Sequence, residues 1–296
     1  MILPKQQAAL PTISGLLIKS AQFLKGKGSA SPRLDAELLL AEVMGLSRIE
    51  LYTNFEQPLT VAEVDRYREL IRRRGRGEPV AYILGRAYFR NLTLAVSGAV
   101  LIPRPETEHV VDAALFFLME RDWSEPPRVL DVGTGSGAIA ISLAAAFPEA
   151  RVAASDDSAE ALALAAENAR TTGVAERIAF VRSDLFDGLE PLETFDLIVS
   201  NPPYVSETEW PDLPRDVSGF EPREALYGGA DGLDFYRRLA VEAPQFLKPR
   251  GGLILEIGYS QAEAVRELLG ASGMFSDIAV IQDYAGHDRV VTAQRI

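Results

Sequence analysis

The sequence predicts an α/β protein with a doubly wound, mostly parallel sheet, preceded by a small helical domain and a β-hairpin. Three observations indicate this fold class. From about residue 106 onward, short apolar runs of strand length alternate with longer segments of helical periodicity. A glycine-rich turn, Gly133 to Gly137, joins one such strand to a helix. Two apolar runs close the chain with no helix between them, which predicts one antiparallel strand.

The composition limits the class of protein. A chain of 296 residues is expected to hold two domains, and its 47% apolar fraction and mean hydropathy of +0.03 are ordinary for a globular protein. No apolar run reaches the ~18 residues of a membrane span, and no signal region opens the chain. The lack of cysteine excludes disulfides and thiolate chemistry and fits a cytoplasmic protein. With only His109 and His287, we expect no metal site.

The charge is distributed unevenly along the chain. Residues 1–90 carry 14 Lys and Arg against 9 Asp and Glu, whereas residues 91–296 carry 16 against 33, within a net charge of −12. An acidic body repels duplex DNA, whose binding rests on neutralising phosphates. We therefore expect no nucleic-acid substrate, although the basic front could face an acidic protein or an RNA surface.

Residues 1–76 are expected to form a helical domain. Ser31-Pro32 is typical of a helix start, and Thr60 with Glu63 matches a capping box that opens a further helix. That helix ends in the basic run Arg72 to Arg76. We interpret the run as a solvated helix end, where cations are favoured. Contact with an acidic or phosphate surface of a partner is the alternative.

Residues 77–105 are predicted to link the two domains as a β-hairpin. Leu92, Leu94 and Val96 alternate with small or polar residues, which is the period of a strand. Ser97-Gly98 supplies a turn before a second apolar run at residues 100–102.

Residues 106–296 form the third predicted segment, which carries the alternation of strands and helices. The Pro-rich stretch 205–232 has no clear periodicity, and loops of such length are usually functional or mobile. Strands are predicted at residues 128–132, 151–155, 177–181, 195–199, 252–257, 278–282 and 289–293. Helices are predicted at residues 108–121, 138–147, 159–172, 233–247 and 261–269.

Candidate site residues follow the ends of the first three strands. The alternating glycines of Gly133 to Gly137 come after Asp131 and let a ligand approach the backbone and the helix amino end. Their spacing differs from the dinucleotide fingerprint, and the loop lacks the lysine of a Walker loop. Asp156 ends the second strand, where a carboxylate can bind vicinal ribose hydroxyls. Asp184 follows the third strand and could accept an adenine amino proton.

The fourth strand runs into Ser200-Asn201-Pro202-Pro203-Tyr204. Two prolines end the strand and hold Asn201 at the sheet edge where open α/β folds bind their ligands. The Asn201 amide and the Pro202 carbonyl offer two oxygens for both N–H bonds of a planar NH2 group, and Tyr204 adds a flat surface. An ordinary strand-ending turn is the alternative for these residues alone.

In this order the motifs resemble those of class I S-adenosylmethionine-dependent methyltransferases. The stretches Gly77 to Tyr82, Leu101 to Glu108 and Asp283 to Val290 make the chain similar to the HemK/PrmC family, the glutamine-N5 methyltransferases of peptide chain release factors. The resemblance implies a Rossmann-like domain and S-adenosylmethionine as cofactor. It also implies that the protein substrate is a release factor, methylated on the glutamine of its Gly-Gly-Gln motif to tune translation termination. No membrane partner is expected.

The resemblance further implies a role for each site residue. Holding both N–H groups of the substrate amide would aim its poorly nucleophilic lone pair, so that the rate comes from orientation and no general base is assigned. The helices of residues 1–76 are expected to recognise the protein substrate. Asp157 stands where the family usually has an apolar residue. Cofactor contacts are expected from Gly133, Thr134, Gly135, Ser136, Gly137, Asp156, Asp184, Leu185 and Asn201, substrate contacts from Asn201, Pro202, Pro203 and Tyr204, and catalytic roles from Asn201, Pro202 and Tyr204.

Three alternative functions stay open. The nearest is the sister enzyme that methylates a ribosomal protein, whose linker usually reads Pro-Arg-Ser-Pro where this chain has Pro103 to Glu106. A nucleic-acid amino-methyltransferase shares Asn-Pro-Pro-Tyr, but a large basic region would be expected. A catalytically silent cofactor-binding protein would not need both Asp156 and Asn201.

Overall fold

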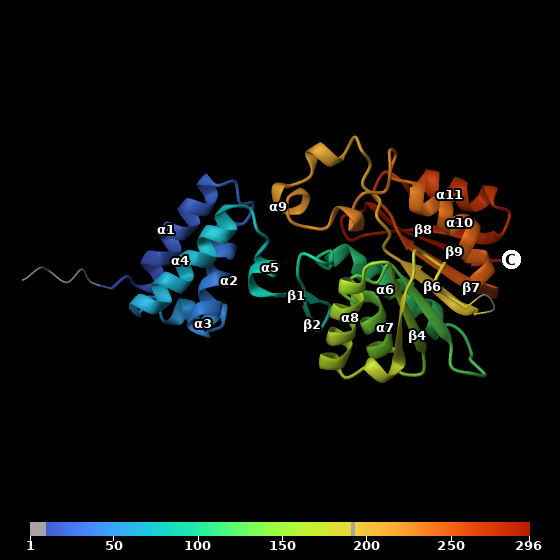
Figure 1. Ribbon diagram of the computed structural model, residues 1–296, viewed down its shortest axis with the longest axis horizontal. Coiled ribbons are helices and arrows are strands. Elements are labelled where there is room, and N and C mark those ends of the chain that lie inside the picture. Colours follow the sequence, from blue (N-terminus) through green and yellow to red (C-terminus); the bar gives the residue numbers. More distant parts are fainter. Residues whose placement is uncertain (1–9, 191–192) are drawn as a thin grey trace, which may run out of the picture. The chain divides into compact units, whose positions relative to one another are not determined.

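The computed structural model describes residues 10–190 and 193–296, which form two compact units (Figure 1). The first unit takes in the chain up to Gly85 together with Pro214–Phe220, and the second comprises Arg86–Leu213 and Glu221–Ile296. Residues 77–85, expected in the linker, thus lie in the first unit, and the three-part division of the sequence stays a prediction.

The first unit is helical. Its apolar side chains meet in one core, in which Leu17, Leu39 and Tyr67 are fully buried. Thr60 and Glu63 form the predicted capping box at the start of α4, each side chain accepting from the backbone of the other. Ser31 precedes α2 as predicted, although its side chain makes no capping bond. The helices are α1 (Ile13–Gly26), α2 (Pro32–Met44), α3 (Arg48–Thr53), α4 (Val61–Gly75), α5 (Val80–Leu84) and α9 (Arg215–Ser218).

The basic run at the end of α4 is not solvated throughout, so the interpretation of a solvated helix end is wrong for Arg74. This side chain is only 9% exposed, and its Nε lies 2.6 Å from the Asp35 carboxylate of α2. Its Nη2 lies 3.2 Å from Asp216 of α9. Arg73 pairs with Glu78 nearby. Two carboxylates remote in the sequence converge on Arg74, which local charge patterning does not reveal.

Replacing Arg74 by alanine should destabilise the first unit by about 3–5 kcal/mol, because Asp35 would stay buried without its cation. Hydrogen exchange of the α2 and α4 amides measures this loss. Arg68→Ala is the matched control, since Arg68 and Asp65 form an exposed pair on the same helix that should contribute less than about 1 kcal/mol. Equal protection losses in the two variants would contradict the buried-pair assignment.

The second unit begins with a hairpin that differs from the predicted one. Its strands are β1 (Arg86–Phe89) and β2 (Leu92–Ala95), with Phe89 opposite Leu92, so the chain turns at Arg90-Asn91 and not at Ser97-Gly98. Arg90 adopts a φ of 52°, and its backbone N–H donates to Glu108. The expected partner strand at residues 100–102 is absent, because Asn168 occupies the edge of β2 by bonding both the N–H and the C=O of Ala95.

The main sheet has seven strands in the order β5-β4-β3-β6-β7-β9-β8. All neighbouring pairs are parallel except the two made by β9. This confirms the prediction of a mostly parallel sheet with one antiparallel strand. The strands are β3 (Arg128–Val132), β4 (Arg151–Asp156), β5 (Ile178–Arg182), β6 (Phe195–Ser200), β7 (Leu247–Glu256), β8 (Phe275–Gln282) and β9 (Asp288–Arg295).

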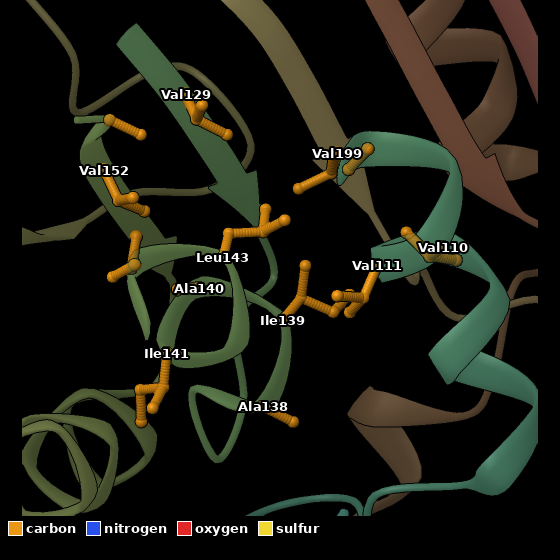
Figure 2. Close-up of a cluster of buried hydrophobic side chains, with 14 of the residues drawn as sticks. Val110, Val111, Val129, Ala138, Ile139, Ala140, Ile141, Leu143, Val152 and Val199 are labelled. Carbon is orange, nitrogen blue, oxygen red and sulfur yellow. The ribbon is translucent and has the colours of Figure 1, made fainter. Parts of the chain in front are cut away.

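Helices pack on both faces of this sheet and bury two apolar cores. One core joins α6, α7 and α8 to alternate strand residues such as Val129 and Val199 (Figure 2). The other joins α10 and α11 to the intervening residues, such as Leu130 and Ile198. In the part of the chain that the structure describes, no helix is long and apolar enough to cross a membrane. These helices are α6 (Glu108–Met119), α7 (Ala138–Ala146), α8 (Ala159–Thr172), α10 (Asp234–Phe246) and α11 (Ala262–Ala271).

The strand order reverses direction at β3. From β3 the chain proceeds outward to β4 and β5, then returns to place β6 on the other side of β3. The loops that follow the neighbouring strands β3 and β6 therefore turn away from each other at the carboxyl edge of the sheet. In open α/β sheets such a switch point leaves a crevice at the carboxyl ends of the strands.

Candidate functional site

A cleft of about 1220 Å³ lies at this switch point in the second unit. It is bounded by the loops after β3, β4, β5 and β6 and by the amino-terminal part of α10. Gly137, Pro202 and Tyr204 do not line it: Gly137 caps α7, Pro202 is buried, and Tyr204 turns toward β7. The predicted site residues that do line it are Gly133, Thr134, Gly135, Ser136, Asp156, Asp184, Leu185, Asn201 and Pro203.

The glycine-rich loop after β3 presents bare backbone to the cleft. Gly133 and Gly135 have φ values of 71° and 54°, a region that side chains disfavour. A Cβ at either position would have no atom within 4 Å, so the space above the loop is open. Gly137 has another role, because a Cβ there would lie 2.8 Å from Ile141 and 3.1 Å from Ala165. Two of the glycines leave room for a ligand, and the third allows helix packing.

Asp131 holds this loop from beneath. Its carboxylate is fully buried, and Oδ2 accepts bonds from the Thr134 hydroxyl (2.7 Å) and the Ala140 N–H (3.1 Å). Oδ1 has no hydrogen-bond partner among the residues that the structure describes. Burial raises the pKa of Asp131 to about 7, although the two hydrogen bonds oppose this shift. The charge is therefore costly at neutral pH.

Relative to the wild type, Asp131→Asn is expected to be more stable at pH 8 than near pH 4. A folded-state pKa raised from 3.8 to about 7 means that the favourable contribution is complete below pH 4 and lost as the pH rises to 7. The asparagine oxygen keeps both bonds without the charge, although its NH2 then lies buried at the position of Oδ1, so the variant should gain on the order of several kcal/mol relative to the wild type between pH 4 and pH 8. Unfolding free energies of both proteins between pH 4 and 8 measure it. A pH-independent difference would contradict the raised pKa.

Asp156 lies at the end of β4 beside the glycine-rich loop. Its Oδ2 accepts from the Gly135 N–H at 2.8 Å, and its Oδ1 accepts from the Ser158 N–H at 3.0 Å. Burial raises the pKa of this carboxyl. Each oxygen still has a lone pair, so the carboxylate can accept further bonds from a ligand in the cleft.

The loops after β4 and β5 form the neighbouring wall. Asp184 receives the Arg238 guanidinium of α10 at 2.7 Å, so one of its oxygens is already bonded. Leu185 is buried with a φ of 50°. The Asp157 side chain is 79% exposed, and its backbone carbonyl accepts from Arg182. Asp157, which stands where an apolar residue was expected, therefore turns its carboxylate mainly to solvent.

Asn201 is fixed by a contact from another segment. Its Nδ2 donates to the Thr107 hydroxyl at 3.1 Å, which leaves Oδ1 as the free end of the amide. Ser200, one residue earlier, donates its hydroxyl to the Val132 carbonyl of β3 at 2.7 Å. Gln261 donates to the Tyr204 carbonyl at 3.0 Å. The loop is thus held at both ends, and within the described part of the chain Asn201 Oδ1 is left as an unused acceptor at the cleft.

Two buried acids beside the cleft were missed by the sequence analysis. Glu256, at the end of β7, is 1% exposed and accepts the Tyr204 hydroxyl at 3.4 Å. The sequence feature that could have identified Glu256 is an ionisable residue within the apolar run 253–257. Glu221 accepts from the Ile102 N–H at 3.1 Å and from Arg104. The sequence feature that could have identified Glu221 is an acid between Phe220 and Pro222 in the long Pro-rich stretch.

The cleft therefore combines three elements: open backbone after β3, a half-buried carboxylate at the end of β4, and a positioned amide after β6. Together they suit two ligands: one that carries a ribose, and one that presents a planar amide with N–H groups. Among residues 10–190 and 193–296, no group of three or more His, Asp or Glu is arranged to hold a metal ion.

Comparisons with known proteins match this chain to one kind of protein, both through family models and through relatives that cover most of its length. Residues 15–85 match the model of the PrmC N-terminal domain, and residues 107–212 match the methyltransferase small domain. The release factor glutamine methyltransferase of Rhodopirellula baltica is 44% identical over 285 residues, which is 96% of both chains. That of Chlorobaculum tepidum is 46% identical over 279 residues, 93% of this chain and 94% of the other. A methyltransferase structure from Pyrococcus furiosus has a TM-score of 0.50 at 21% identity, covering 69% of this chain and 89% of the other.

Proposed function

Because the chain belongs to the family of release factor glutamine methyltransferases, we propose that it methylates the side-chain amide nitrogen (N5) of the glutamine in the Gly-Gly-Gln motif of peptide chain release factors. Membership confirms the predicted Rossmann-like methyltransferase fold and its dependence on S-adenosylmethionine. The observation that carries the proposal is the Asn201 amide, held by Thr107 with its oxygen free.

The residues of the cleft fit S-adenosylmethionine. Gly133 and Gly135 leave space directly above the backbone, and Asp156 keeps acceptor capacity for ribose hydroxyls. Asp184 and Leu185 are proposed to lie against the adenine, where Arg238 holds one oxygen of Asp184. When bound, the cofactor supplies an electrophilic methyl group on a positively charged sulfur.

The protein's contribution to the reaction is orientation. We propose that Asn201 Oδ1 and the Pro202 carbonyl accept the two N–H groups of the substrate amide. Pro203 lines the cleft beside it, whereas Tyr204 turns toward β7. Fixing both N–H groups aims the nitrogen lone pair, and oriented reactants can lower a barrier by about 7–11 kcal/mol. The nitrogen loses its proton after methylation, so this chain needs no general base.

The helical first unit is proposed to recognise the body of the release factor, because its match to the PrmC N-terminal domain ends where the cofactor-binding unit begins. A short Gly-Gly-Gln peptide should accordingly be a much poorer substrate than the intact factor. Residues 91–296 carry 16 Lys and Arg against 33 Asp and Glu, a net charge of −17, which supports a protein substrate over a nucleic acid. The lack of cysteine supports a cytoplasmic location.

The test is a methylation assay with labelled S-adenosylmethionine and three acceptors: purified release factor, ribosomal proteins, and RNA. We expect label on release factor alone, mapped by mass spectrometry to the amide of its Gly-Gly-Gln glutamine. Label on a ribosomal protein would favour the sister activity instead. Cofactor binding without transfer to any acceptor would favour a catalytically silent protein.

A further inference from the structure

The rim of the cleft holds one arginine that no carboxylate neutralises among the described residues. Arg223 lines the cleft from the start of the short 3-10 helix η4 (Arg223–Ala225) and is exposed. The other arginines that line the cleft each have a carboxylate within 4.0 Å, in the pairs Arg104–Glu221, Arg182–Asp157 and Arg238–Asp184. In a chain of net charge −12, acids are plentiful, so an arginine without an ion pair beside the site is available to a ligand.

Two aromatic rings hold the Arg223 guanidinium in place. Its Cζ lies 5.1 Å from the ring centre of Trp210 and 4.7 Å from that of Tyr227. The two rings stand at 85° to each other, so the guanidinium lies in the corner between them. A cation over a ring face is attracted by the π electrons and needs no acceptor oxygen. The rings therefore fix Arg223 and leave its planar fork of N–H donors without a protein acceptor in the described part of the chain.

Backbone contacts place this arginine at the Asn201 end of the cleft. The Gly228 N–H donates to the Val205 carbonyl at 2.9 Å. A Cβ on Gly228 would lie 2.6 Å from the Pro203 carbonyl oxygen, so the two segments are packed closely together. The turn that carries Arg223 is thus held against the loop that begins at Asn201. We therefore expect the ligand of Arg223 beside the acceptor amide.

The acceptor segment supplies a ligand of matching chemistry. Glycine has no side chain, so two glycines before an acceptor glutamine can be recognised only through their main-chain N–H and C=O groups. A guanidinium donates and never accepts, so it selects the carbonyls. Hydrogen bonds with a charged donor are roughly twice as strong as neutral ones. A neutral carbonyl is also not repelled by Glu224, which is exposed next to Arg223 and lines the same cleft.

We propose that Arg223, held by Trp210 and Tyr227, binds a main-chain carbonyl of the Gly-Gly segment that precedes the acceptor glutamine. Arg223 is then a substrate-binding residue, because this contact fixes the course of the segment and brings the glutamine amide to Asn201. The inference rests on the proposed function, which supplies the Gly-Gly-Gln segment. The contact forms on binding and is kept during transfer, so its loss should raise KM and change kcat less.

Arg223→Ala tests this contact by steady-state methylation of intact release factor, paired with calorimetric cofactor binding. We expect KM for release factor to rise about tenfold or more, as for the loss of a charged hydrogen bond, and cofactor affinity to change less than about threefold. Arg223→Lys keeps the charge but not the planar fork, and its KM should lie in between. Arg266→Ala is the control: it removes an exposed arginine of α11 outside the cleft and should leave KM nearly unchanged.

A substrate analogue separates a direct contact from a structural role. In two Gly-Gly-Gln peptides, one glycine carbonyl at a time is replaced by a thiocarbonyl, whose sulfur is a weaker acceptor. One of the two replacements should lower kcat/KM for the wild type and have no further effect in Arg223→Ala, because the two changes remove the same bond. Losses of equal size in the two proteins for both peptides, or no loss in the wild type, overturn the proposal.

The remaining outcomes tell the two proposals apart. If Arg223→Ala weakens binding of S-adenosylmethionine but not of decarboxylated S-adenosylmethionine, the guanidinium holds the cofactor carboxylate and the proposal is wrong. An unchanged KM for release factor in Arg223→Ala refutes this inference and leaves the proposed function standing. If the wild-type protein methylates no release factor, the proposed function fails and this inference fails with it.

Discussion

Asn201→Ala should lower the single-turnover rate of methyl transfer by several orders of magnitude while changing S-adenosylmethionine affinity far less. The alanine removes Oδ1, the acceptor that the Thr107 contact leaves free at the cleft. Pro202 and Pro203 continue to restrict the backbone, and Ser200 still bonds to the Val132 carbonyl. The loop should therefore keep its course, and the loss should lie in the orientation of the substrate amide.

Asn201→Asp is the graded comparison for this prediction. It keeps an acceptor at the same position but loses the NH2 that bonds Thr107 and adds a negative charge. We expect its rate to fall between those of alanine and wild type. The measurement pairs single-turnover transfer at saturating cofactor with calorimetric cofactor binding. If the alanine variant transfers at nearly the wild-type rate, or loses only cofactor binding, Asn201 does not position the acceptor.

Asp156→Ala should weaken S-adenosylmethionine binding by roughly tenfold to a hundredfold, since hydrogen bonds to a charged group contribute about 1.5–3 kcal/mol. The carboxylate also receives the Gly135 and Ser158 N–H groups, so its removal loosens the glycine-rich loop as well. Both effects act on the ground-state complex. Calorimetry should show weaker binding, and the transfer rate at saturating cofactor should fall less than the affinity.

Asp157→Ala is the matched control for this measurement. The neighbouring carboxylate carries the same charge but is 79% exposed, and no bond from the glycine-rich loop reaches it among the described residues. Its removal should change cofactor affinity by less than about threefold, as expected for a solvated charge. Equal losses in the two variants would point to the net charge of the cleft, and would remove the ribose assignment from Asp156.

Much of the fold and of the cleft follows from local patterns. The alternation of strands and helices predicts parallel strands, whose carboxyl ends meet at one sheet edge. Residues that follow those strands, such as Gly135, Asp156 and Asn201, are consequently brought together. The capping box of α4 is also local and is found at its predicted position, and α8 spans the predicted residues 159–172.

Contacts between distant segments decided the rest. The hairpin pairs 86–89 with 92–95 because Asn168 of α8 takes the edge of β2. Arg74 is buried because Asp35 and Asp216 meet it from two other helices. Glu256 reaches the site because β7 lies beside β6 in the sheet. Periodicity and turn chemistry report on a few neighbouring residues, so they specify elements and sheet edges. Hydrogen-bond partners 39 to 142 positions apart are set only when the whole chain has packed.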